Sequence, residues 1–411
     1  MDFDDTPEEA AFRAEARGWL TQHATLITAG TPRRSPWGGI DEGEHIRACK
    51  QWQRTLYDGG WAGITWPKAY GGRAASAIEA AIFNQEQAKF DVSAGVFAVG
   101  IGMVGPTLIA HGTPEQKDRY LDRMLRGEEV WCQLFSEPGA GSDLAGLGTR
   151  AVRDGDEWVV NGQKVWNSGA HFSDLGILLA RTDPSQPKHR GITYFLVDMK
   201  TPGIDVRPLR QITGVAHFNE VFLTDVRIPV DNVVGSPNGG WGVAQTTLAN
   251  ERTLIGGSGG AGLGFGGLAD LARMMHRAGD PILRQEMAAA YTRFQILRFL
   301  GYRVQTAISQ WRPPGPESSV MKLFVSQHLA RTGDLICALE GMDATLAGAD
   351  SPDDGFWLGQ FLNQWASRLG GGTDQIQRNI IGERVLGLPG EPRVDKTLPF
   401  NELASGGPGR A

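Results

Sequence analysis

The stretch "WCQLFSEPGAGSDLAGLGTRAVRDGDEWVVNGQKVWNSG", residues 131–169, decides the fold class of this chain. Much of it alternates apolar and polar residues and is rich in β-branched and aromatic side chains, which is typical of β-strands. Turn signals interrupt it at Asp154-Gly155-Asp156 and at Asn161-Gly162, and Asn-Gly is the strongest hairpin dipeptide. The stretch therefore predicts an antiparallel sheet that begins near Glu129.

Similar short strands continue to about Pro229, whereas the residues on both sides have helical patterns. Thr6 to Glu9 and Thr113 to Gln116 are capping boxes, each with Pro at the first helical position. Segregated helices and strands predict an α+β chain. We expect an all-α domain over residues 1–128, a β-domain over 129–238, a helical bundle over 239–400 and a disordered tail over 401–411.

Composition narrows the function classes. The 411 residues exceed what one core usually serves, and the 41% hydrophobic and 21% charged content is ordinary for a globular protein. A net charge of −6 argues against nucleic acid or an anionic membrane as the main partner. The acidic N-terminus does not resemble a signal or transit peptide, and no run approaches the ~20 apolar residues of a membrane span. We expect a cytoplasmic protein.

Metal and nucleotide motifs are weak. The cysteines Cys49, Cys132 and Cys337 lie far apart without zinc-ligand spacing, and the eight histidines have no HxxH pattern. "GLGFGG", residues 262–267, matches the dinucleotide fingerprint G-x-G-x-x-G, but a helical pattern precedes it where that fingerprint requires a strand. Close packing of two helices is the better interpretation of these glycines.

The loop "SEPGAGSD", residues 136–143, is a stronger candidate because it follows a strand and combines glycines, serines and an acid. Such a loop can direct backbone N–H groups and the Ser142 hydroxyl at a phosphate, although an ordinary turn has the same composition. Trp166 ends a later strand beside Asn167 and Ser168. It suits either stacking on a flat cofactor or packing in a core.

Residues 131–169 closely resemble the FAD-binding middle domain of acyl-CoA dehydrogenases. "GGTDQIQRNIIGERVLGLP", residues 371–389, resembles the last helices of that family, and "GWAGITWPKAYGG" and "HGTPEQK" resemble its N-terminal domain. The resemblance runs in the family's order from about Phe12 to Pro389. It implies an α-domain, a β-domain and a C-terminal four-helix bundle, normally assembled as a dimer of dimers.

The resemblance also implies that this chain binds FAD. Gln133, Phe135 and Ser136 match the strand that hydrogen-bonds the flavin pyrimidine edge. Trp166 and Ser168 match residues at the isoalloxazine ring and near flavin N5. The positions matching FAD contacts at the phosphates and in the C-terminal bundle are Gly141, Ser142, Thr373 and Gln375.

The catalytic base departs from the common pattern. Many family members carry a Glu immediately before the Gly-Thr of the C-terminal motif, and this chain has Gly371 there. A minority take the base from the first long bundle helix, and Glu251 in "ANERTLIGG" matches that position. The resemblance therefore implies Glu251 as the base and Gly371 and Arg252 as substrate contacts. A solvated helix residue is the competing interpretation of Glu251.

The implied reaction converts an acyl-CoA to a trans-2-enoyl-CoA, with electron-transfer flavoprotein as the acceptor. Two regions depart from the family's contacts with a neighbouring subunit's FAD, residues 275–285 and 339–357. They keep two alternatives open: a non-catalytic or half-site FAD/CoA-binding subunit of a hetero-oligomer, and a flavin oxidase on the same fold.

Two further features concern the substrate. The run "IGGSGGAGLGFGG", residues 255–267, suits a roomy acyl pocket for a branched or ring-bearing chain, or else close helix packing. Lys188, His189 and Arg190 suit a contact with a CoA phosphate, or else a solvated loop.

Overall fold

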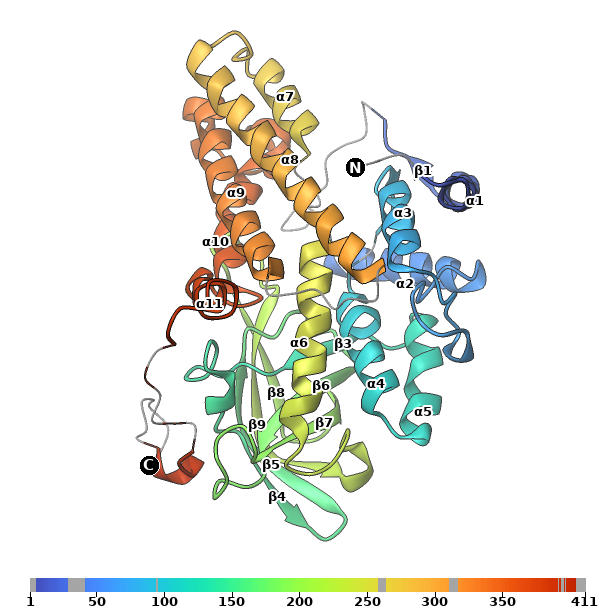
Figure 1. Cartoon of the computed structure of the whole chain (residues 1–411), viewed down its shortest axis with the longest axis vertical. Coiled ribbons are helices and arrows are strands. Elements are labelled where there is room, and N and C mark those ends of the chain that lie inside the picture. The colour runs from blue at the N-terminus through green and yellow to red at the C-terminus, as the bar shows by residue number, and fades with distance from the viewer. Residues whose placement is uncertain are drawn as a thin grey trace. The chain divides into compact units, whose positions relative to one another are not determined.

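The computed structural model describes residues 5–28, 41–93, 95–257, 264–309, 317–390, 392, 395 and 397–403 (Figure 1). The chain divides into two compact units. The first takes in residues 1–45, 74–93 and 252–390, and the second takes in 46–73, 94–251 and 391–411. These units cut across the three predicted domains, whose boundaries stay a prediction.

The second unit contains a seven-stranded sheet in the order β3-β6-β4-β5-β9-β8, with β7 also paired to β6. Most neighbours are antiparallel, as predicted, but β3 pairs with β6 in parallel, and so does one residue of β4. The fully antiparallel sheet was therefore wrong at these pairs. The strands are β3 (Trp131–Leu134), β4 (Arg150–Asp154), β5 (Glu157–Val165), β6 (Leu175–Arg181), β7 (Ile192–Asp198), β8 (Ile204–Leu209) and β9 (Phe218–Pro229).

Of the two predicted turns, one is confirmed and the other is wrong. Asp154 to Asp156 does join β4 to β5, with Gly155 at φ +60°. Asn161-Gly162, in contrast, lies within β5 at a β-bulge opposite β9. A Cβ at Gly162 would come within 2.4 Å of the Thr149 hydroxyl oxygen, so glycine serves close approach of the two backbones here and not a hairpin.

Helices of the second unit pack on the sheet around a core that includes Leu125, Trp131, Tyr194 and Val243. The helices α2 and α6 each continue into the first unit. The helical elements are α2 (Glu42–Asp58), η1 (Lys68–Tyr70), η2 (Gly100–Val104), α4 (Gly105–His111), α5 (Pro114–Leu125), η3 (Leu144–Gly146), η4 (Val230–Asn232), α6 (Gly240–Gly257) and η9 (Phe400–Glu402).

The first unit is helical apart from the short pair β1 (Thr25–Leu26) and β2 (Phe90–Asp91). Leu271, Leu339 and Trp357 belong to its buried core. Its helical elements are α1 (Pro7–His23), α3 (Ala77–Gln87), α7 (Phe265–Met274), α8 (Pro281–Ser309), α9 (Glu317–Glu340), η5 (Gly341–Thr345), η6 (Gly348–Asp350), η7 (Pro352–Gly355), α10 (Phe356–Leu369), α11 (Asp374–Ile380) and η8 (Ile381–Val385).

Both predicted capping boxes are confirmed. Thr6 and Glu9 bond each other's backbone N–H groups at the start of α1, and Thr113 and Gln116 do the same for α5. Residues 401 and 402 of the predicted tail belong to η9 (Phe400–Glu402), so disorder was wrong there, and residues 404–411 lie outside the described residues.

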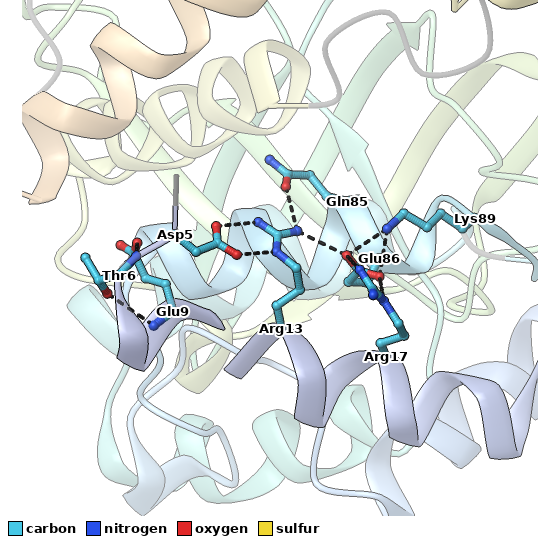
Figure 2. Close-up of polar contacts among 8 residues, drawn as sticks. All are labelled: Asp5, Thr6, Glu9, Arg13, Arg17, Gln85, Glu86 and Lys89. Carbon is cyan, nitrogen blue, oxygen red and sulfur yellow. Dashed lines mark hydrogen bonds and ion pairs between the residues drawn. The ribbon is translucent and has the colours of Figure 1, made fainter. Parts of the chain in front are cut away.

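A buried carboxylate joins α1 to α3 in the first unit. Glu86 is fully buried and accepts hydrogen bonds from Arg17, Arg13 and Lys89 at 2.8–3.1 Å, while Asp5 binds the far side of Arg13 (Figure 2). The hydrogen bonds from Arg17 outweigh burial and, with those from Lys89 and Arg13, lower the pKa of Glu86 to about 2.

This network yields a prediction on stability. Glu86→Gln should lower the free energy of unfolding by about 3 kcal/mol, because three cations lose one buried counter-charge. Since the pKa of Glu86 is depressed on folding, its contribution is complete above the unfolded value near 4.5 and disappears as pH falls towards 2. Urea titrations at pH 7 and pH 3 measure both effects. A wild-type–mutant difference that is the same at both pH values would contradict the assignment.

Candidate active site

The "SEPGAGSD" loop begins directly after β3 and is closed by a tight turn. The backbones of Glu137 and Ala140 exchange two hydrogen bonds of 3.0 Å. Gly141 and Ser142 follow on the exposed side, and a Cβ added at Gly141 would meet nothing within 4 Å. Within the described residues, the N–H groups of Gly141 and Ser142 donate to no other part of the chain. The loop therefore presents open backbone donors, as an anion site requires.

A buried ion pair joins the start of this loop to the residues just before β4. The Lys164 ammonium, fully buried at the end of β5, donates to Glu137 Oε1 at 2.7 Å and to the Phe135 carbonyl at 3.1 Å. The Glu137 carboxylate also accepts from the N–H groups of Gly148 and Thr149, at 2.7 and 2.9 Å. Burial raises the pKa of Glu137, but the charge and hydrogen bond of Lys164, together with the hydrogen bonds from Thr149 and Gly148, outweigh it and hold that pKa below the ordinary value. This pair was not predicted from the sequence.

Trp166 extends from the end of β5 with its side chain 61% exposed and its backbone at φ +64°. A bulky residue in the left-handed region is uncommon and marks either a turn or stored strain at a functional site. Its ring packs in a T-shaped arrangement against Phe218, at 5.9 Å between centroids. Of the two interpretations of Trp166, the core one is wrong, because the residue is 61% exposed.

Phe135, Ser136 and Ser168, which match flavin contacts of the family, lie in ordered parts of the chain near Trp166. Phe135 is buried in the core, and the carbonyl of half-buried Ser136 accepts from Val165 N–H at 2.9 Å. Ser168 is half-buried in the turn after β5. Asn167, which the sequence analysis did not assign, is buried and donates to the Gln133 carbonyl at 2.8 Å, so it joins the end of β5 to β3.

The helix α6 brings Glu251 to the same strand. The Gln133 side-chain amide lies 3.5 Å from Glu251 Oε2. One turn earlier, the Thr247 hydroxyl lies 2.9 Å from Thr107 and 3.2 Å from Tyr194, so this face of α6 is fixed against α4 and β7. Glu251 is half-buried and lies beside the strand that leads into the loop. The simple solvated-residue interpretation does not describe it.

The C-terminal motif belongs to the first unit. Gly371 and Gly372 have φ values of +63° and +85°. Residues with a Cβ rarely adopt such values, which explains the glycines at this turn. The Thr373 hydroxyl caps α11 by accepting from Ile376 N–H at 3.2 Å, and Gln375 is exposed. Arg252 follows Glu251 in α6, and its side chain lies outside the described residues. Residues 258–263 of the glycine-rich run 255–267 lie outside them as well.

Of the basic residues Lys188, His189 and Arg190, Lys188 fits neither a CoA-phosphate contact nor a solvated loop. Its side chain is 7% exposed, and its ammonium donates to Asp143 Oδ1 and Oδ2 at 2.8 and 2.9 Å and to Asp395. Burial lowers the pKa of Lys188, but the hydrogen bonds to Asp143 and Asp395 outweigh it and hold that pKa above the ordinary value. Lys188 is therefore occupied within the chain and is not a contact for a CoA phosphate.

Among the described residues no cluster of His, Cys, Asp and Glu is able to hold a metal ion. No helix in the described ranges is both long and apolar enough to cross a membrane. Among the described residues, the element that precedes "GLGFGG" is the helix α6 and not the strand that the dinucleotide fingerprint requires.

Comparison with known proteins identifies the family. Residues 6–128, 132–226 and 238–386 match the acyl-CoA dehydrogenase N-terminal, middle and C-terminal domains. The chain is 40% identical over 395 residues to the acyl-CoA dehydrogenase IpdE1 of Mycobacterium tuberculosis, covering 93% of this chain and 98% of that protein.

Two solved structures are similar over the same length. The Tcur3481-Tcur3483 steroid ACAD has a TM-score of 0.82 and 29% identity, over 95% of this chain and 100% of that one. The ChsE4-ChsE5 complex from Mycobacterium tuberculosis has a TM-score of 0.78 and 31% identity, with the same coverage.

This chain belongs to the acyl-CoA dehydrogenase family and has its fold, with helical N- and C-terminal domains and a middle sheet domain. It is accordingly an FAD-dependent oxidoreductase, and the predicted α+β class is confirmed. The residues present fit the cofactor: Trp166 is exposed, and within the described part of the chain the N–H groups of Gly141 and Ser142 donate to no other group.

The exposed Trp166 yields a second prediction. Trp166→Ala should weaken FAD binding roughly 2- to 10-fold, because stacking on an aromatic ring contributes about 0.5–1.5 kcal/mol beyond burial. The melting temperature of the flavin-free protein should barely change, because the side chain is exposed. Trp365→Ala, at a 49% exposed tryptophan of α10, is the matched control. Equal flavin retention by both variants after dialysis would exclude Trp166 from the cofactor site.

Proposed function

We propose that this protein oxidises an acyl-CoA thioester to a trans-2-enoyl-CoA, with Glu251 removing the α-proton. The observation that supports this most directly is the contact between Glu251 and Gln133. It brings a half-buried carboxylate beside β3, the strand that leads into the candidate cofactor loop. A proton acceptor at that place would act on a substrate bound next to the flavin.

Each of these groups of the chain has a separate role in the proposed reaction. The Gln133 amide, 3.5 Å from Glu251 Oε2, orients the Glu251 carboxylate. The N–H groups of Gly141 and Ser142 hold phosphate, and Trp166 supports the ring. FAD, when bound, accepts the hydride from the β-carbon. The substrate roles of Gly371 and Arg252, and the FAD contacts of Thr373 and Gln375, rest on the family resemblance.

We infer a bulky, ring-bearing acyl group as the substrate class. The support is the similarity to a protein described as a steroid ACAD, at 29% identity over nearly the whole chain. A ring-bearing acyl chain also agrees with the many small residues in 255–267. Electron-transfer flavoprotein as acceptor and a cytoplasmic location remain predictions from the sequence.

A hetero-oligomer is the second candidate, in which a related chain completes the FAD sites. Both similar structures are described by pairs of chain names, Tcur3481-Tcur3483 and ChsE4-ChsE5. In this chain, moreover, residues 341–355 form the three short turns η5, η6 and η7, in the region where the sequence departs from the family's contact with a partner's FAD. The dimer of dimers predicted from the sequence is compatible with this arrangement.

The base assignment yields a third prediction. Glu251→Gln should fold and bind FAD and acyl-CoA, because the amide is nearly isosteric. Flavin reduction should slow by about 10²–10⁴-fold, the usual loss when a general base is removed. Stopped-flow bleaching at 450 nm measures it, with the exposed Glu128→Gln as control. Bleaching by Glu251→Gln at the wild-type rate would refute Glu251 as the base.

A fourth prediction separates the candidate functions. The purified chain should be yellow and bleached anaerobically by ring-bearing acyl-CoAs, with a higher kcat/KM than for butyryl-CoA. Better turnover of butyryl-CoA would refute the proposed substrate class. A colourless chain that gains flavin and activity only with a related subunit identifies the half-site alternative, and rapid peroxide release in air identifies an oxidase.

A further inference from the structure

The C-terminal segment, here Asp395 and residues 397–403, lies along the loop that joins β6 to β7. Phe400 N–H donates to the Gln186 carbonyl at 2.9 Å, and Asn401 N–H donates to the Pro184 carbonyl at 3.0 Å. Pro399 forms a β-bridge with Pro187. The segment is thus held in a defined register against the second unit.

Two buried cations lie under this segment. Asp395 accepts a hydrogen bond from the Lys188 ammonium, and the Phe400 ring lies 3.8 Å from the guanidinium carbon of Arg181. Lys188 has a 7% exposed side chain and Arg181 is 2% exposed, so neither charge is solvated. Buried cations require such partners, and the C-terminal segment supplies one to each.

The same two cations hold the loop that follows Gly141 and Ser142. Lys188 Nζ donates to both oxygens of Asp143, at 2.8 and 2.9 Å. Arg181 Nη2 donates to the carbonyls of Ala145 and Leu147, at 2.6 and 3.3 Å, and Arg181 Nη1 donates to the Lys188 carbonyl at 2.7 Å. The loop's backbone and the Asp143 side chain are therefore fixed from the β6–β7 side.

We propose that Lys188 and Arg181, held by Asp395 and Phe400, are positioning residues that keep the Gly141–Ser142 turn in the shape that binds the FAD phosphates. This inference rests on the proposed function, which puts FAD at that turn. A turn that is already ordered loses less conformational entropy when the cofactor binds. The ammonium of Lys188 also offsets the negative charge of Asp143, whose side chain is 62% exposed one residue after Ser142.

Asp395→Asn and Phe400→Leu in the full-length chain test the inference. The first removes the charge and keeps the shape, and the second removes the aromatic ring and keeps apolar bulk. Hydrogen exchange of the flavin-free protein should accelerate at Gly146 and Leu147, whose N–H groups bond within the loop. The Kd for FAD, from titration of the flavin-free protein, should rise roughly 3- to 30-fold.

Glu402→Gln is the matched control for Asp395→Asn, because Glu402 is exposed in the same segment. Lys188→Met should weaken FAD binding as the other variants do, and Lys188→Arg should restore most of it by keeping a cation at Asp143. The wild-type values of exchange and Kd should persist in Glu402→Gln. Because these readouts need no substrate, they are independent of whether Glu251 is the base.

Three results would overturn the inference. The first is unchanged exchange at residues 143–149 in Asp395→Asn and Phe400→Leu. The second is faster exchange with an unchanged Kd for FAD, which would make the contacts purely structural. The third is tighter FAD binding by Asp395→Asn, which would mean that removing a negative charge matters more than ordering the turn.

Discussion

The buried ion pair of Lys164 and Glu137 is the constraint on which the candidate cofactor site depends. An ammonium with no exposed surface must be paired, and Lys164 has only the Glu137 carboxylate and the Phe135 carbonyl as hydrogen-bond acceptors among the described residues. The same carboxylate binds the N–H groups of Gly148 and Thr149, so one pair joins the start of the loop to the residues just before β4. Loss of either partner would leave a buried charge and release this connection.

The strand that supplies this ammonium also supplies the ring. Trp166 follows Lys164 by two residues, so the pair that holds the loop also fixes the end of β5 from which the indole extends. Asn167 joins the same end to Gln133 in β3, and the Gln133 side chain contacts Glu251 in α6. Loop, ring and carboxylate are therefore linked through a short series of hydrogen bonds within one compact unit. Such a series can hold reacting groups to the tolerance that catalysis requires.

Local signals predicted part of this structure well. Thr6 and Thr113 begin helices because a capping box satisfies backbone N–H groups from residues three apart, a condition visible in sequence. Asn161-Gly162 failed as a hairpin signal because β5 continues through a bulge, where Gly162 lies against Thr149, the residue before β4. Neither of the two interpretations of Lys188 described it, for a similar reason, since Asp395 lies 207 positions away along the chain. The loop and Trp166 were predicted as cofactor contacts only through the resemblance to acyl-CoA dehydrogenases, because their residue types alone also suit an ordinary turn and a core aromatic.

The sequence by itself determined the class of fold, the order of helices and strands, the family, and the residues that match its site, because these depend on local periodicity and on motifs within short stretches. Only the tertiary structure decided which side chains support the site. Three supporting pairs join residues that are distant in sequence: Glu137 with Lys164, Asp395 with Lys188, and Phe400 with Arg181. The sequence around one member of a pair does not indicate its partner. A buried charge takes whichever partner the fold brings within hydrogen-bond distance, so such pairs become visible only when the chain is folded.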